Sequence, residues 1–406
     1  MPADTSDHRR VLVANSFSGR RWLDAASDGA ERAGLAIAQR HGVPASVARL
    51  LAIRGVTDSE VEDYLDPTLK RLMPDPSTLQ GMDAAAERLA DAIRNQEPVA
   101  IFGDYDVDGA ASSALLARFL RHFELAPQVH IPDRITEGYG PNSDAIDALA
   151  EKGATLLVTV DCGTSGHGPL AHAKARGLDV IVLDHHQTDG DLPDVLSLVN
   201  PNRPDCASGQ GHLCAAGVVF LTLVAVARLL RAQPATVAPP QLLEWLDLVA
   251  LATVCDVVPL KSLNRAFVVK GLAVMGKRIN PGLAALQDVG RVTGPLTPYH
   301  LGFILGPRIN AGGRIGRAEL GSLLLATDDP AKALRYAGEL DLLNAERQAM
   351  EAEMLKAAFA QAESQVATDP DAAALVIADP GWHSGLVGLL ASRVKDRFRR
   401  PVIAVA

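Results

Sequence analysis

The sequence predicts an α/β protein built on a parallel sheet. Short apolar runs at residues 99–102, 156–160 and 180–183 alternate with helical patterns, and such runs are typical of strands that are buried on both faces. An Ala-, Glu- and Leu-rich stretch at 331–364 predicts a long helix, and a strand–helix–strand pattern follows it at 374–406. We therefore expect a parallel-sheet domain and the start of a second α/β domain, joined by a linker helix.

The composition is that of a globular protein with room for two or three domains. The chain has 406 residues, of which 48% are hydrophobic and 21% charged, and these proportions are typical of folded domains. The net charge of −9 argues against a surface covered in positive charge for non-specific DNA binding, although it leaves room for a local basic groove.

No membrane-spanning or secretory segment is expected. No uninterrupted apolar run reaches the ~18–20 residues that cross a bilayer, and the start of the chain lacks a signal-peptide pattern, so we expect a cytoplasmic protein. The cysteines include no Cys-x-x-Cys pair, which favours reduced structural thiols. A zinc site at Cys206, His212 and Cys214 is a weaker alternative because its spacing is poor.

The first part of the chain predicts short helices after a flexible start at residues 1–20. Thr57 and Glu60 have the spacing of a capping box, which begins a helix, and residues 84–93 predict another helix. We assign residues 1–95 to a helical N-terminal extension.

The remaining boundaries follow from the alternation of elements. We assign 96–328 to the catalytic domain, whose apolar helical stretch at 241–253 ends just before Asp256, and 329–366 to the connecting helix. A single strand–helix–strand cannot bury a core alone, so we expect 367–406 to be a partial, truncated domain.

Aspartates stand at the ends of the apolar segments. Because the carboxyl ends of parallel strands meet at one edge of a sheet, we expect these acids to lie close together. In an extended chain, side chains two residues apart point the same way, so we expect this of Asp104, Asp106 and Asp108. The full set of acids is Asp104, Asp106, Asp108, Asp161, Asp184 and Asp256.

A cluster of carboxylates is best explained by bound divalent metal. Without cations the repulsion and desolvation would cost several kcal/mol. Carboxylates with one or two imidazoles favour Mn²⁺, Mg²⁺ or Fe²⁺, and the number of candidate ligands suits two ions that share a bridging carboxylate. Such pairs hydrolyse phosphoesters.

Each motif by itself has an ordinary structural alternative. Asp104–Gly109 alone also fits a solvated turn or a calcium loop, although the EF-hand glutamate is absent. Asp161 alone fits a strand-to-turn ending, and Asp184-His185-His186 alone fits a polar strand end. Their joint occurrence, each at the end of an element, favours a metal site.

Taken together, the motifs resemble the DHH phosphoesterase superfamily and, within it, the RecJ family of exonucleases that act on single-stranded DNA. The resemblance covers nearly the whole chain and rests on the helical stretch 50–58 and on Gly103–Gly109, Val160–Gly163, Asp184–His186, Ala252–Pro259, Gly306–Arg314 and Gly381–Gly388.

The resemblance implies a ligand set for two ions, Mn²⁺ or Mg²⁺. Asp106 would hold the first ion, with Asp104 as an additional ligand. Asp161 would bridge both ions. The second ion would be held by Asp108, His185 and Asp256. Some members of the superfamily carry a histidine where this chain has Phe102.

The resemblance also implies distinct roles around the ions. His186 would face the scissile phosphate, and Asp184 would orient the two histidines; with Asp161 they form the expected catalytic set. Contacts to phosphate would come from Arg308, Asn310 and Arg314 in a Gly-rich loop, where plain surface charge is the alternative. They would also come from His383 and Ser384, which precede a predicted helix, although an exposed loop histidine is the alternative.

The implied activity is 5′-to-3′ exonuclease cleavage of single-stranded DNA in repair and recombination. The resemblance implies a monomer whose partners are single-stranded DNA, single-strand-binding protein and a helicase, and no membrane. A longer chain with an OB-fold would bind DNA more tightly. Two alternatives stay open: a DHH phosphodiesterase of short oligonucleotides or cyclic dinucleotides, and a catalytically silent nucleic-acid scaffold.

Overall fold

The computed structural model describes residues 10–188, 190–232 and 237–406. Residues 1–9 of the expected flexible start therefore lie outside the described residues. The chain divides into two compact units, one made of Met1–Met73 with Lys261–Ala266 and one made of Pro74–Leu260 with Phe267–Ala406. Each unit is described by itself.

The first unit contains short helices, as expected, and a hairpin that was not expected. Ile37, Ala48 and Leu51 form the centre of its small core. The capping box is confirmed, because the Thr57 N–H donates to Glu60 Oε2 over 2.9 Å. The elements are the antiparallel pair β1 (Val11–Val13) and β2 (Trp22–Leu23), α1 (Asp28–His41), α2 (Ala45–Ile53), α3 (Val61–Leu65) and α4 (Leu69–Leu72).

The second unit is built on a five-stranded sheet in the order β4-β3-β5-β6-β7. All of its pairs are parallel, which confirms the predicted fold class. The edge strands β4 and β7 have only three residues each and were not predicted, because so short a run carries little pattern. The strands are β3 (Val99–Gly103), β4 (Gln128–His130), β5 (Leu156–Val160), β6 (Asp179–Leu183) and β7 (Ser197–Val199).

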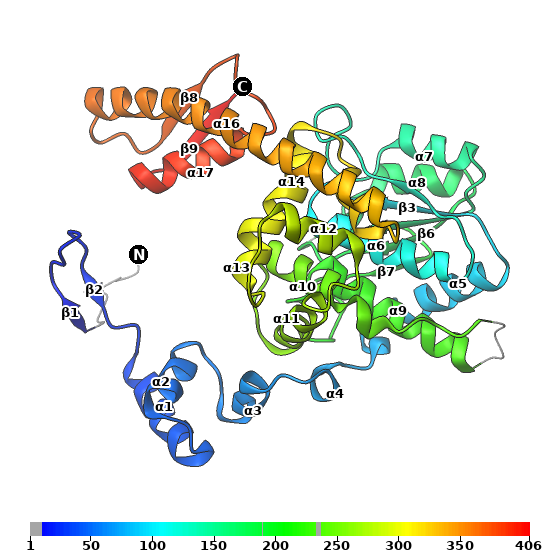
Figure 1. Cartoon of the computed structure of the whole chain (residues 1–406), viewed down its shortest axis with the longest axis horizontal. Helices are drawn as coiled ribbons and strands as arrows, with labels where there is room; N and C mark the ends of the chain where they lie inside the picture. The colour runs from blue at the N-terminus through cyan, green and yellow to red at the C-terminus, as the bar shows by residue number, and fades with distance from the viewer. Residues whose placement is uncertain (1–9, 189, 233–236) are drawn as a thin grey trace. The chain divides into compact units, whose positions relative to one another are not determined.

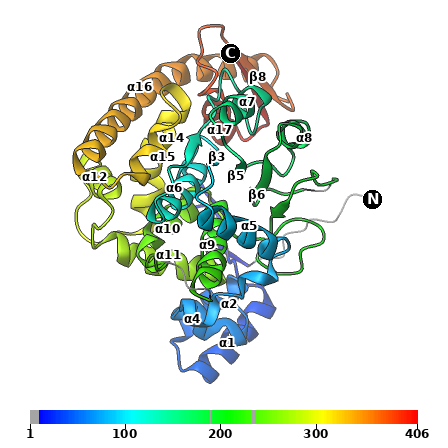
Figure 2. The ribbon, with the colours of Figure 1, turned by 90° about the vertical axis from the view of Figure 1, so that its right-hand side faces the viewer.

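Helices cover both faces of the sheet (Figure 2). On one face, α7 (Ser143–Glu151) and α8 (His167–Ala175) pack their apolar side chains on β3, β5 and β6. On the other face lie α5 (Met82–Arg94), α6 (Val107–His122) and α9 (Ala215–Ala232). This arrangement buries every residue of β3 and β5, which explains their uninterrupted apolar sequences.

The helix α9 is long and apolar enough to cross a membrane by length and composition alone, but 72% of it is buried inside the fold. It packs against α5, α6 and α10 (Leu246–Cys255), and Phe220 and Leu223 are fully buried. Arg228 and Arg231 interrupt the apolar sequence of α9 near its end, so the helix is not an uninterrupted apolar run. Its burial is that of a core helix, which makes it weak evidence for a membrane span.

The segment Gly306–Ile315 is the helix α14, so the expected Gly-rich loop is wrong. Its glycines permit close packing rather than turns. A Cβ at Gly306 would lie 2.5 Å from Cys255 Sγ, and a Cβ at Gly313 would lie 2.5 Å from the Tyr105 carbonyl oxygen. Along the chain, the other elements between α10 and the end of this domain are α11 (Ser262–Met275), α12 (Pro281–Val289), α13 (Pro298–His300), the π-helical turn η4 (Leu301–Leu305) and α15 (Leu320–Ala326).

The chain then continues through the long helix α16 (Pro330–Thr368) into a small parallel sheet (Figure 1). The strands β8 (Leu375–Ala378) and β9 (Val402–Val405) flank α17 (Val387–Phe398). Met354 and Ala358 of α16 share a buried cluster with this sheet and α17. The second half of α16 therefore supplies the packing partner that a lone strand–helix–strand lacks.

Candidate metal centre and its surroundings

The expected acids do meet at the carboxyl edge of the sheet. Asp104 follows β3, Asp161 follows β5 and Asp184 follows β6, and these three strands are direct neighbours. Asp256 comes from a helix instead, as the residue that caps the C-terminus of α10. The ligand atoms of these acids divide into overlapping groups.

The first group consists of Asp104, Asp106 and Asp161, which can each offer one oxygen within 4.8 Å of the others. Asp106 is also the N-cap of α6, where its Oδ1 accepts hydrogen bonds from the Asp108 and Gly109 N–H groups at 2.8 and 3.1 Å. Burial, together with the nearby Asp106 carboxylate, raises the pKa of Asp104 to about 7. A cation would reverse that unfavourable environment.

The second group consists of Asp108, His185 and Asp256, again with ligand atoms within 4.8 Å of one another. His185 Nε2 lies 3.6 Å from Asp108 Oδ2 and 3.7 Å from Asp256 Oδ2. Burial and the neighbouring Asp108 carboxylate raise the pKa of Asp256 to about 8. The three side chains come from three different helices and loops, so only the fold brings them together.

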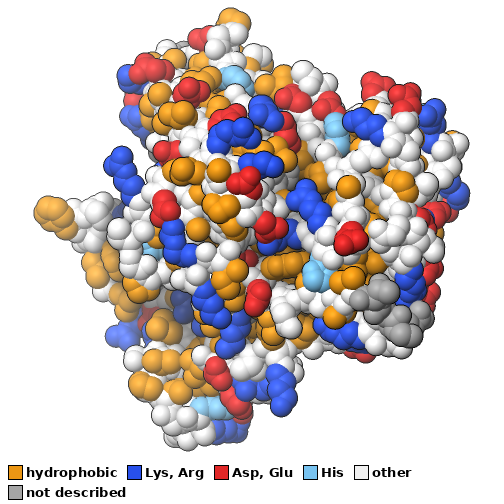
Figure 3. Space-filling view, turned by 45° about the vertical axis from the view of Figure 1, so that its right-hand side comes forward, with side chains coloured by type: hydrophobic (Ala, Val, Ile, Leu, Met, Phe, Trp, Pro, Cys, Tyr) orange, Lys and Arg blue, Asp and Glu red, His pale blue; other side chains and the backbone are white. Residues whose placement is uncertain are grey.

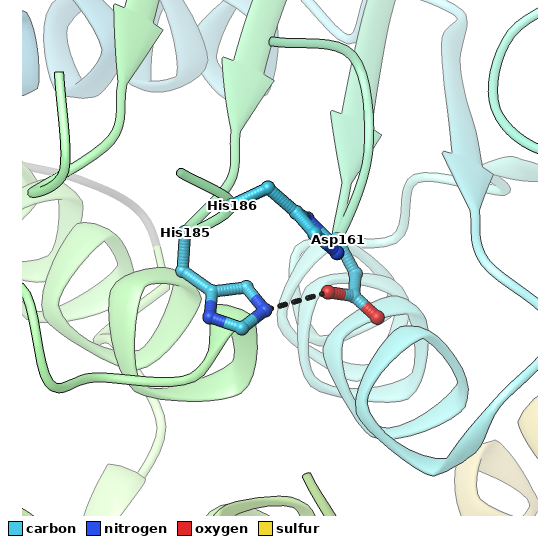
Figure 4. Close-up of side chains that lie close together, drawn as sticks. All are labelled: Asp161, His185 and His186. Carbon is cyan, nitrogen blue, oxygen red and sulfur yellow. Dashed lines mark ion pairs between the residues drawn. The ribbon is translucent and has the colours of Figure 1, made fainter. Parts of the chain in front are cut away.

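Asp161 joins the two groups, because it also has ligand atoms within 4.8 Å of those of His185 and His186, which form a third group with it. Figure 4 shows the ring of His185 pointing at the Asp161 carboxylate, with 3.2 Å between Nε2 and Oδ1. Asp161 is 2% exposed. Burial is the largest cause that raises the pKa of Asp161 well above the ordinary value, and the Asp108 carboxylate is the next. Its backbone φ is 61°, a left-handed conformation that aspartate and asparagine tolerate better than most residues. Asp161 is therefore the best placed residue to bridge two ions.

The three aspartates of the first motif do not point the same way, so that expectation is wrong. The chain is extended only as far as Gly103, and α6 begins at Val107. Asp108 therefore belongs to the second ligand group and Asp106 to the first. The Asp108 oxygens accept from the Ala215 and Ala216 N–H groups at 2.6 and 2.8 Å, at the start of α9. The period-two rule holds for strands only.

The chemistry of these groups fits a pair of divalent cations. Four buried ligand atoms have no hydrogen-bond partner among the described residues: Asp104 Oδ1, Asp161 Oδ1, His185 Nε2 and Asp256 Oδ2. Leaving such atoms unpaired costs about 1–3 kcal/mol each, and more for charged groups. A donor set of carboxylates with one imidazole suits Mn²⁺ or Mg²⁺.

The two adjacent histidines have different surroundings. His185 is directed at the acids, whereas His186 Nδ1 donates to Asp184 Oδ1 over 2.7 Å and its side chain is 46% exposed. The hydrogen bond to Asp184 raises the pKa of His186. Burial alone would raise the pKa of Asp184, but the bonds from His186 and Thr164 hold it below its usual value.

Asparagines that the sequence analysis did not single out hold the backbone of both histidines. Asn200 Nδ2 donates to the His186 carbonyl over 2.9 Å, and Asn202 Nδ2 donates to the His185 carbonyl over 2.6 Å. Both follow β7, a strand that the sequence did not predict. The pattern Asn-Pro-Asn directly after Leu198 and Val199 was the available signal.

The loop after β4 also contributes residues that sequence reasoning missed. The Tyr139 hydroxyl lies 3.3 Å from His186 Nε2 and 3.3 Å from the Asp161 carbonyl oxygen. The Arg134 guanidinium lies 4.1 Å from the centre of the Tyr105 ring. A Gly- and Pro-rich loop offers no periodic pattern, so only the fold reveals that it reaches the site.

Three of the residues expected to contact phosphate, Arg308, Asn310 and Arg314, lie on α14 and differ in how far other contacts already engage them. Arg308 is engaged by Asp341 at 2.8 Å and by the Ile304 carbonyl at 2.7 Å. Asn310 Oδ1 is buried and has no hydrogen-bond partner among the described residues. Burial and the nearby Arg134 and Arg347 lower the pKa of Arg314, although the Asp106 carboxylate opposes this, so Arg314 lies in a group of arginines near Asp106.

His383 and Ser384 lie in the loop before α17. His383 Nδ1 accepts from the Gly385 N–H over 3.1 Å. Arg314 donates to the Gly385 carbonyl over 3.1 Å. The structure thus connects this loop to α14 through Arg314, whereas α17 begins only at Val387, later than expected.

Basic residues on α17 are largely balanced by acids. Arg393 lies 3.4 Å from Glu351, and Arg397 lies 2.6 Å from Glu363 and packs over the Phe359 ring. The face in Figure 3 likewise shows basic and acidic side chains interspersed. The weaker zinc alternative finds no support, because Cys214 contacts Thr253 and Cys206 contacts Ser208.

The comparisons with known proteins agree with this geometry. Residues 98–253 match the model of the DHH family, N-terminal domain. The single-stranded-DNA-specific exonuclease RecJ of Salmonella typhimurium is 39% identical over 90% of this chain and 64% of its own length. The chain thus spans somewhat less than two thirds of the length of this relative.

Solved structures extend the similarity to three dimensions. A crystal structure of exonuclease RecJ bound to manganese superposes with a TM-score of 0.71 at 37% identity, over 82% of this chain and 81% of that one. RecJ of Thermus thermophilus in complex with Mn²⁺ gives a TM-score of 0.78 at 34% identity, over 92% of this chain and 52% of that one. The chain therefore belongs to the DHH family, with the RecJ exonucleases as its relatives.

Proposed function

We propose that this protein is a two-metal-dependent exonuclease that hydrolyses single-stranded DNA in the 5′-to-3′ direction. The observation that carries the proposal is a pair of ligand groups linked by Asp161, which belongs to the first group and lies 3.2 Å from His185 of the second. Four of their buried ligand atoms have no hydrogen-bond partner among the described residues. The manganese-bound relative supports Mn²⁺ or Mg²⁺ as the cofactor. The names of the relatives support single-stranded DNA as the substrate.

Each group of the site has a task in this proposal. Bound ions would supply a hydroxide and stabilise the departing oxygen. Asp104, Asp106 and Asp161 would hold one ion, and Asp108, His185 and Asp256 the other. Asp161, 3.2 Å from His185 Nε2, would bridge both. The protein would thereby fix the geometry that an in-line displacement requires.

The phosphate itself would meet groups outside the ligand set. His186, whose pKa is raised by its hydrogen bond to Asp184, would donate from Nε2 to a phosphate oxygen. Arg314 and Arg134 supply positive charge beside Tyr105 and Asp106. Asp184 acts through His186, which makes it a positioning residue. His383 and Ser384, next to the Arg314 contact, are proposed to bind phosphate further along the strand.

The organisation and partners are part of the same proposal. Residues 96–328 would form the catalytic domain between the extension 1–95 and the connecting helix 329–366, with 367–406 as part of a DHH-associated domain. The protein would act as a monomer in DNA repair and recombination, together with single-strand-binding protein and a helicase.

Digestion of end-labelled oligonucleotides tests the activity. With Mn²⁺, a 5′-labelled single strand should release labelled mononucleotide at once, whereas a 3′-labelled strand should shorten progressively; EDTA should stop both reactions. Immediate release of labelled mononucleotide from the 3′-labelled strand would refute the proposed 5′-to-3′ direction. Cleavage of dinucleotides but not of long strands would favour a small-substrate phosphodiesterase instead, and no cleavage with either metal would favour a silent scaffold.

A further inference from the structure

Two aromatic side chains lie exposed and stacked on the segment between α10 and α14. Tyr299 is 60% exposed and Phe303 is 71% exposed. Their ring centres are 5.2 Å apart with an angle of 24° between the planes. Aromatic residues are scarce in this chain, and large ones such as Phe102 and Phe220 are fully buried. Other aromatic side chains, such as Tyr139, are also exposed, but among the described residues Tyr299 and Phe303 are the aromatic pair that is both exposed and stacked.

The backbone holds the pair in place. Tyr299 lies on α13 and Phe303 on the π-helical turn η4. On the inner side of the turn, Leu301 and Leu305 are fully buried. A capping box begins α13, with the Thr297 N–H donating to His300 Nδ1 over 3.0 Å. The two rings thus form the outer face of an anchored element, which we call the aromatic platform.

The aromatic platform adjoins the metal centre. Cys255 Sγ contacts the Leu301 carbonyl oxygen at 3.4 Å, and the residue after Cys255 is the metal-ligand candidate Asp256. Val257, which follows in turn, is 86% exposed. The turn η4 packs against α10, α13 and α14, whose positions can be followed in Figure 1. An exposed apolar side chain, Val257, therefore directly follows the ligand candidate Asp256 in the chain.

A nucleobase is the ligand that this geometry fits. Base stacking on aromatic side chains tolerates any sequence, since every base has a flat π-face. In a duplex those faces are covered by neighbouring bases, so such a surface would favour unpaired strands. We propose that Tyr299 and Phe303 bind a base of the strand whose end is cleaved at the metal centre. This inference rests on the proposed function and adds a determinant of single-strand selectivity.

Substitutions that remove the ring but keep an apolar side chain test the aromatic platform. Tyr299→Leu and Phe303→Leu should each weaken binding of a phosphorothioate-linked, uncleavable single strand about tenfold. Tyr299→Phe and Phe303→Tyr should bind like the wild type because a ring remains. Leu334→Ala is the matched control, since Leu334 is a comparably exposed apolar side chain, 62% exposed, on α16.

A scan of abasic sites distinguishes stacking from a structural effect. In the wild type, one abasic nucleotide should weaken binding as much as the leucine substitutions do. In Phe303→Leu the same abasic nucleotide should have no further effect. Unchanged affinity in both leucine variants, or equal loss at every abasic position, would overturn the inference. Binding is measured without turnover, so failure of the wild type to cleave would refute the proposed function alone.

Discussion

At the residue scale, the most specific prediction concerns the adjacent histidines. His185→Ala should weaken Mn²⁺ binding, because Nε2 is the imidazole atom directed at the acids. His186→Ala should keep Mn²⁺ affinity and lower kcat about 10²–10³-fold, the usual loss when one donor to a reacting oxyanion is removed. Calorimetric titration with Mn²⁺ and turnover measurements check the two effects. Equal loss of metal affinity in both variants would contradict the assignment.

Asp161 should be indispensable for turnover but not for folding. Asp161→Ala should abolish cleavage because the proposed bridging ligand is removed. Asp161→Asn is the sharper variant, since asparagine tolerates the left-handed φ of 61°. Because burial raises the pKa of Asp161 well above its usual value, the asparagine variant should unfold at higher urea concentration than the wild type in EDTA. Wild-type turnover in either variant would refute the two-metal mechanism.

The burial of Asp247 predicts a pH dependence of the free energy of unfolding that does not involve the metal centre. It is 2% exposed, and burial raises its pKa to about 7 despite the charge of Arg118. A raised folded pKa contributes stability below the unfolded pKa of about 4, and this stability is lost as the pH rises through about 7. At pH 8, Asp247→Asn should therefore raise the free energy of unfolding by an amount on the order of 2–4 kcal/mol.

Urea unfolding of both proteins in EDTA at several pH values measures this effect. The difference between Asp247→Asn and the wild type should vanish below about pH 4 and grow toward pH 8. A difference that does not change with pH would mean that Asp247 does not titrate in this range.

At the element scale, the approach of α14 to the first aspartate motif is the sensitive contact. A Cβ at Gly313 would lie 2.5 Å from the Tyr105 carbonyl oxygen, whereas a Cβ at Gly338 in α16 would meet nothing within 4 Å. Gly→Ala in a helix ordinarily stabilises by about 1 kcal/mol, but overpacking costs about 1–3 kcal/mol. At Gly313 we expect the clash to outweigh the gain in helix propensity, because the Tyr105 backbone oxygen cannot move aside cheaply. The substitution should therefore lower the free energy of unfolding.

Gly313→Ala should therefore lower both stability and turnover, since Tyr105 lies between two ligand candidates. Gly338→Ala should be neutral or stabilising and should leave turnover unchanged. Urea unfolding and mononucleotide release, measured on both variants, give the comparison. A stable and fully active Gly313→Ala would show that α14 does not constrain the motif.

At the scale of the whole molecule, metal binding should be coupled to global stability. The buried acids are uncompensated without cations, and a ligand that binds only the folded state stabilises it by about 2.7 kcal/mol at 100 times its Kd. Mn²⁺ should therefore raise the melting temperature of the wild type, and EDTA should reverse the change. Asp161→Asn should lose most of the increase. An identical increase in that variant would place the stabilising ion elsewhere.

Local sequence was sufficient for the strands and helices with strong patterns. β3, β5 and β6 have uninterrupted apolar sequences, and α16 has a long stretch with few helix breakers, so their positions could be predicted closely. The three-residue edge strands and α9 were not predicted, because the former are too short for a pattern and the latter is apolar on all sides. α14 was mistaken for a loop because glycine signals both turns and close packing.

The sequence by itself determined which residue types carry the chemistry, because acids and adjacent histidines at the ends of apolar runs have few structural explanations. Only the tertiary structure decided how they are grouped. In the sheet, β5 lies between β3 and β6, which sets Asp161 between Asp104 and His185. The start of α6 separates Asp108 from Asp106. Strand order and helix onset depend on packing between segments far apart in the chain, and no local pattern encodes them.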